Sequence, residues 1–156
     1  MTTSNFEARL AELGIELPNA VPPAANYVPA RRSGSLIYIA GQVPTAIGKD
    51  QYVGKVGRDV SIEDAQKAAR LCAINILAQL RTALGGSLNA VVGCVRLGGF
   101  VNATPEFGDH PKVINGASDL MVEVFGDAGR HARAAVGCNS LPRNVAVEVD
   151  AIFEVA

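Results

Sequence analysis

Tryptophan does not occur among the 156 residues, aromatic residues make up only 5%, and the formal net charge is −1. No run of lysine and arginine is longer than the pair in "ARR" at 30–32. A nucleic-acid-binding protein needs a broad positive surface, and single strands also need aromatic side chains for base stacking. The composition therefore argues against nucleic acid as a partner.

Long apolar runs are also missing, since no segment approaches the ~20 residues that a membrane-spanning helix needs. The N-terminus has no basic stretch followed by an apolar one, as a secretion signal would. The three cysteines, Cys72, Cys94 and Cys138, are far apart in apolar sequence, which favours reduced thiols over a disulfide framework. We expect a cytoplasmic protein that does not bind membranes.

Neither a zinc-ligand spacing nor a glycine-rich phosphate-binding motif occurs, so we expect no metal and no cofactor. What is abundant is aliphatic residues: hydrophobic types make up 49% of the chain and charged types 19%. A chain of this length fits one domain, residues 1–156, and its aliphatic excess indicates a surface buried against another subunit.

Hydrophobic periodicity and helix caps predict three helices, the first with a Ser4–Glu7 capping box and an end at Gly14. The second is predicted from Ser61 to Gly85 and the third over 108–126, with Pro111 in its first turn. Strands are predicted over 28–31, 35–40, 89–102, 134–140 and 144–155. This order predicts an α+β two-layer sandwich, a mixed sheet with helices on one face.

The last predicted strand carries a carboxylate, Glu148, among apolar residues. Alternation places Val147 and Val149 on one face and Glu148 on the other, away from the helices. Glu148 can simply face water. If a neighbouring subunit covers that face, however, the carboxylate is partly buried and needs a donor. Arg133 is expected at the start of the adjacent strand. It is either an ordinary surface arginine or a residue whose planar guanidinium group binds a substrate carboxylate through two parallel hydrogen bonds.

Two stretches carry a family resemblance: "YVPARRSGSLIYIAGQVP" at 27–44 and "ARAAVGCNSLPRNVAVEVDAI" at 132–152. With them the chain resembles the RidA (YjgF) family of imine/enamine deaminases over roughly residues 26–153. The resemblance implies a chorismate-mutase-like fold assembled as a homotrimer, with three sites in clefts between subunits. It also implies a small carboxylate substrate.

The resemblance further implies roles for five residues. Arg133 matches the arginine that holds the substrate carboxylate, and Glu148 matches the glutamate that positions or activates water. Tyr27 and Gly41 match residues that line the pocket, and Asn115 matches a helix asparagine. The expected reaction is hydrolysis of small 2-imino or 2-enamino acids to 2-keto acids and ammonia.

The chain departs from the family at Ala135, where family enzymes commonly carry cysteine two positions after the arginine. Cys138 is expected on the opposite strand face and does not replace it. The N-terminal helix, within residues 1–14, also lies outside the common pattern, which indicates a divergent branch. Two alternatives stay open: a binding or regulatory trimer with little catalysis, and the endoribonuclease activity once described for the family, which the composition argues against.

Overall fold

A computed structural model describes residues 4–156. Residues 1–3, part of the predicted N-terminal helical segment, lie outside the described residues. The elements follow in the order α1 (Phe6–Glu12), β1 (Ala30–Ser33), β2 (Leu36–Gln42), β3 (Thr45–Ala46), β4 (Lys49–Asp50), α2 (Ile62–Ala83), β5 (Val91–Asn102), α3 (His110–Phe125), β6 (Ala132–Cys138) and β7 (Val147–Val155), with short 3-10 turns at Gly126–Gly129 and Pro142–Asn144. None of the helices within residues 4–156 is long and apolar enough to span a bilayer.

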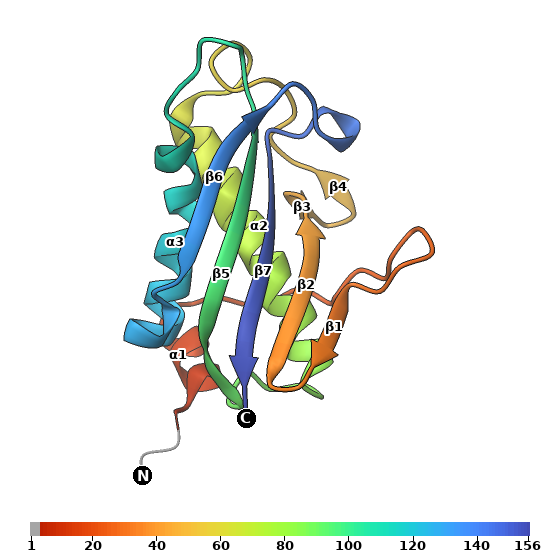
Figure 1. The fold of residues 1–156 in the computed structure, drawn as a ribbon, viewed down its shortest axis with the longest axis vertical. Helices are drawn as coiled ribbons and strands as arrows, with labels where there is room; N and C mark the ends of the chain where they lie inside the picture. The colour runs from red at the N-terminus through yellow and green to blue at the C-terminus, as the bar shows by residue number, and fades with distance from the viewer. Residues whose placement is uncertain (1–3) are drawn as a thin grey trace.

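The five main strands form one sheet in the order β1-β2-β7-β5-β6, and Figure 1 shows this sheet in front of α2. β5 and β6 pair in parallel, whereas the other neighbours are antiparallel. The predicted α+β sandwich with a mixed sheet is therefore confirmed. The β3–β4 hairpin forms a separate two-stranded sheet.

One predicted neighbour relationship is wrong. The strand of Arg133, β6, does not lie beside β7, because β5 is inserted between them and pairs with both. β5 is the longest strand and is buried along much of its length, so it takes a central position rather than an edge. A short chain connection between β6 and β7 does not require the two strands to pair.

The core lies between the sheet and the helices. Along β7 the burial alternates, with Val147, Val149 and Ala151 buried and Glu148 and Asp150 partly exposed, as predicted. The predicted inner faces of the long helices are buried as well: Ala65, Ala69, Cys72, Ile76 and Leu80 in α2, and Val113, Ala117, Leu120 and Val124 in α3. Gly116 allows close packing of the helices, because a Cβ there would collide with the Gln66 carbonyl.

Helix ends follow the predicted caps except at α1. Ser61 caps α2 by accepting a hydrogen bond from the Asp64 amide at 3.1 Å, and Gly126 ends α3. The cap of α1 is Asn5 rather than Ser4: the Asn5 carboxamide accepts from the Ala8 amide at 2.9 Å. The predicted capping box does not form, because Glu7 instead accepts a hydrogen bond from the distant Leu88 amide at 2.8 Å.

All three cysteines are free thiols, as predicted: Cys72 and Cys94 are buried and Cys138 is half-buried. Burial raises the pKa of Cys94 to about 12, so this thiol stays protonated at neutral pH.

Candidate functional site

A cleft of about 920 Å³ lies between residues 16–29, helix α2 and the chain from Gly41 to Asp50. Tyr27, Gly41 and Glu148 all line it. Three of the five residues implied by the family resemblance are thus brought together, although they come from distant parts of the chain.

The Glu148 carboxylate lies against the backbone of Gly41. β2 and β7 pair regularly up to Ile39, and their register shifts between Ile39 and Gln42, which places a bulge at Ala40 and Gly41. A Cβ at position 41 would overlap Oε1 of Glu148. Glycine is therefore needed here for space, and the bulge brings its backbone to the carboxylate.

The pKa of Glu148 is raised above its ordinary value, chiefly because partial burial penalises the charged form. The negative charge of Asp150 raises the pKa further, while the positive charge of Arg143 opposes the shift. A carboxyl group whose pKa is moved toward neutrality can both accept and return a proton.

An ion pair that sequence reasoning missed lies on the rim of the cleft. Arg143 donates to Asp50 through Nη2 at 3.0 Å and through Nε at 2.5 Å, and the Thr45 hydroxyl donates to Asp50 at 3.1 Å. The hydrogen bond from Arg143 lowers the pKa of Asp50. Arg143 and Asn144 both have left-handed backbone conformations, with φ of 53° and 61°. Through Arg143 and its ion pair with Asp50, this turn in the β6–β7 connection is bound to the β3–β4 hairpin.

Two amides of α2 hold the walls of the cleft. The Asn75 side chain donates to the carbonyls of Val43 and Thr45, each at 3.0 Å. The Gln79 side chain donates to the Val21 carbonyl at 2.8 Å. These contacts fix both the hairpin segment and the proline-rich segment to the same helix.

The other two predicted site residues meet elsewhere. Arg133 donates through Nη1 to the Asn115 carboxamide oxygen at 2.9 Å and to the Ser118 hydroxyl at 3.0 Å, and through Nη2 to the Pro111 carbonyl at 3.3 Å. Three of the five guanidinium N–H groups are used in this way, and Nε and one N–H of Nη2 remain for an anion. Helix α3 thus fixes the orientation of Arg133.

A histidine extends this cluster. Nδ1 of His131 lies 2.6 Å from the Gly129 carbonyl, which can only accept, so Nδ1 carries the proton. Nε2 of the neutral ring then accepts from the Ser118 hydroxyl at 2.8 Å, and the Ser118 oxygen accepts from Arg133. Burial lowers the pKa of His131, the hydrogen bond to the Gly129 carbonyl opposes this shift, and the charge of Arg133 lowers the pKa further, so the net shift favours this neutral form. Ser118 lacked any recognisable sequence signal.

Within one chain, Arg133 and Glu148 lie on opposite faces of the sheet. Arg133 pairs with Leu97, which is fully buried beneath the helices, whereas Glu148 pairs with Phe100, which is 36% exposed on the other face. One small ligand therefore cannot contact both side chains of the same chain. The register also places Cys138 on the face opposite Arg133, as predicted, and Ala135 on the same face as Arg133.

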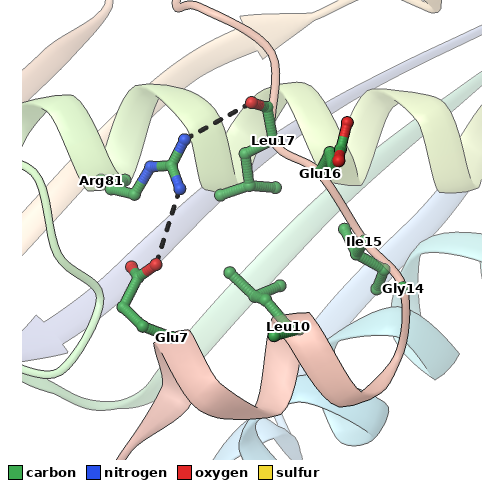
Figure 2. A pocket seen from close by; sticks show the side chains of 8 residues that line it. Glu7, Leu10, Gly14, Ile15, Glu16, Leu17 and Arg81 are labelled. Carbon is green, nitrogen blue, oxygen red and sulfur yellow. Dashed lines mark hydrogen bonds and ion pairs between the residues drawn. The ribbon is translucent and has the colours of Figure 1, made fainter.

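A second cavity of about 570 Å³ lies between α1, the following chain and α2 (Figure 2). Arg81 lies 3.5 Å from the Glu7 carboxylate and donates to the Leu17 carbonyl at 3.4 Å. These contacts join the N-terminal segment to α2, and we assign no ligand to this cavity. Within residues 4–156 no cluster of three or more metal-ligating side chains occurs.

Comparison with known proteins agrees with the fold. Residues 7–155 match the family described as "YjgF/chorismate_mutase-like, putative endoribonuclease". The chain belongs to this family, which confirms the resemblance to RidA (YjgF) proteins seen in the sequence.

Individual relatives extend over nearly the whole chain. Protein TCP17 of Trypanosoma cruzi is 44% identical over 99% of this chain and 96% of its own length. The RutC family protein PH0854 of Pyrococcus horikoshii is 30% identical over 86% of this chain and 90% of its own. The crystal structure of Atu1372 from Agrobacterium tumefaciens, a protein of unknown function, is 53% identical with a TM-score of 0.90 and covers 97% and 92% of the two chains.

Proposed function

We propose that the protein hydrolyses 2-imino and 2-enamino acids to 2-keto acids and ammonia, in clefts between the subunits of a homotrimer. The observation that carries this proposal is the placement of Arg133 and Glu148. Asn115 and Ser118 orient Arg133, and Glu148 lies against Gly41, yet Arg133 and Glu148 lie on opposite faces of one sheet. A second copy of the chain must supply the other half of such a site.

The free face of the sheet supports assembly. Tyr38, Phe100 and Val136 are 46%, 36% and 46% exposed on this face, and the Arg96–Asp150 ion pair lies among them with 3.5 Å between Nη1 and Oδ1. Apolar side chains grouped on one face mark a surface that is covered in the working protein. β6, which carries Arg133, lies at an edge of the sheet, where another subunit can approach it.

In the proposed reaction, the remaining N–H groups of Arg133 hold the substrate carboxylate. Water attacks the carbon of the protonated imine while Glu148 of a neighbouring subunit accepts one proton from the water, which gives a neutral tetrahedral carbinolamine. Glu148 then returns this proton to nitrogen. As the C–N bond breaks, Glu148 takes the hydroxyl proton, the carbonyl forms, and ammonia and the 2-keto acid leave. An enamine first becomes an imine by taking a proton at carbon. The raised pKa of Glu148 suits these proton transfers.

A second candidate is a trimer that binds keto acids without catalysis. Ala135, in place of the family cysteine on the Arg133 face, favours this alternative. The test is release of ammonia from freshly generated 2-aminoacrylate, followed beside calorimetric binding of a 2-keto acid. Deamination above the spontaneous rate supports the enzyme, whereas binding without any acceleration supports the second candidate.

A further inference from the structure

Apolar side chains remain exposed along the cleft that contains Glu148. Val21 is 63% exposed, Tyr27 is 54% exposed and Ile47 is fully exposed, and all three line the same cavity. Ligand pockets are typically concave and largely apolar, with a few polar groups that orient the ligand. This cleft has that composition, with Glu148 as a polar group at one side.

Ile47 combines exposure with an unfavourable backbone. It lies at the tip of the β3–β4 hairpin with φ of 52°, a left-handed conformation that β-branched residues rarely adopt. Asparagine or glycine would suit this turn better and would not expose an apolar side chain. Ile47 combines a strained backbone conformation with an exposed apolar side chain, and strained residues of this kind are often found at functional sites.

The cleft is also much larger than the smallest substrates require. An imine derived from alanine has six non-hydrogen atoms and needs on the order of 200 Å³, at roughly 30 Å³ for each water-sized group. Within one chain, the cleft measures about 920 Å³. Its floor includes Ile74 and Ala78, and the amide donors of Asn75 and Gln79 beside them are bound to backbone carbonyls. Polar residues such as Glu16, Gln42 and Asp50 also line the cleft, but the larger part of its lining is apolar.

We propose that the cleft selects 2-imino acids with a large apolar side chain, branched aliphatic or aromatic. The side chain lies among Val21, Ile47 and Ile74, while the imine carbon is presented to Glu148. This inference rests on the proposed deaminase function and assigns the substrate class of the same site.

The experiment compares imines generated in place by an amino-acid oxidase, with catalase present, from alanine, leucine and phenylalanine. One methylene in an apolar pocket changes kcat/KM by roughly 10–200-fold. We therefore expect kcat/KM for the leucine or phenylalanine imine to exceed that for the alanine imine by at least about 10-fold. Equal values, or a preference for the alanine imine, would overturn the inference.

Two substitutions at the hairpin tip test the contact itself. Ile47→Asn removes the apolar group and suits the left-handed turn, so the fold is retained. It should reduce kcat/KM for the larger imines by roughly 5-fold or more and reduce kcat/KM for the alanine imine by a smaller factor, so that the preference for large side chains falls. Ile47→Leu, the matched control, should keep the wild-type preference. An unchanged preference in Ile47→Asn would exclude the contact.

Calorimetry with pyruvate, 4-methyl-2-oxopentanoate and phenylpyruvate separates this inference from the deaminase proposal. If no imine is hydrolysed but the larger keto acids bind more tightly, the deaminase proposal fails and the apolar preference stands. If all imines are hydrolysed but rates and affinities do not depend on the side chain, the apolar preference fails and the deaminase stands. If no imine is hydrolysed and keto-acid affinity does not depend on the side chain, both the deaminase proposal and the apolar preference are overturned.

Discussion

The Glu148 carboxylate occupies the space that a Cβ at Gly41 would need. Gly41 does not have a positive φ, so Gly41→Ala introduces a steric conflict and not backbone strain. We expect the carboxylate to be displaced, turnover to fall by roughly 10-fold or more, and stability to fall by about 1–3 kcal/mol. Steady-state deamination and urea unfolding measure the two effects.

A matched glycine is available as a control for this substitution. Gly108 also lacks a positive φ, and a Cβ there meets no atom within 4 Å. Gly108→Ala should leave turnover and stability near wild type. A loss of turnover in Gly108→Ala equal to that in Gly41→Ala would contradict a specific conflict with Glu148.

Glu148→Gln should separate chemistry from binding. The amide keeps the shape of the side chain but cannot accept a proton, so turnover should fall by roughly 10² or more. Binding of a 2-keto acid, measured by calorimetry, should change little. Equal turnover in the two proteins would show that Glu148 is only the partly solvated face of β7.

Arg133→Lys should weaken carboxylate binding with the fold intact. Lysine keeps the charge but lacks the planar fork, and the lost contact is worth about 1.5–3 kcal/mol, or on the order of 10–100-fold in Kd. Arg130→Lys is the control, because Arg130 makes an exposed ion pair with Asp127. Unchanged keto-acid affinity in Arg133→Lys would rule out the proposed role.

His131 should make stability depend on pH on the acidic side of neutrality. Its pKa in the fold lies below the ordinary value of 6.5. As pH falls through 6.5 the unfolded chain takes up a proton that the folded chain does not, so stability decreases until pH reaches the lowered pKa. His131→Gln should reduce the dependence of the free energy of unfolding on pH, measured by urea unfolding at fixed protein concentration. His110→Gln should retain the wild-type dependence on pH. Identical slopes in wild type and His131→Gln would contradict the account.

The elements were predictable from the sequence because their signals are local. Ser61 and Gly126 mark helix ends through caps, and the alternation around Glu148 follows from strand geometry. The placement of Glu148 away from the helices was therefore correct. The Asn5 cap was missed because two neighbouring residues, Ser4 and Asn5, are both good caps.

Strand pairing was less predictable, because it depends on long-range packing. The insertion of β5 between β6 and β7 separates Arg133 from Glu148. No local sequence pattern indicates this strand order. The Arg133–Ser118–His131 contacts and the Asp50–Arg143 pair likewise join segments whose proximity is set by the whole fold. Family resemblance identified individual residues, whereas their grouping into two separate clusters came from the structure.

The most direct test of the account mixes two variants whose activity is reduced for different reasons. Arg133→Lys and Glu148→Gln subunits are unfolded together, refolded as a mixture and assayed, beside each variant treated alone. If each site takes Arg133 from one subunit and Glu148 from another, random trimers should recover about one quarter of wild-type activity, because some sites then receive both native residues. Activity no higher than that of the separate variants would contradict a site shared between subunits.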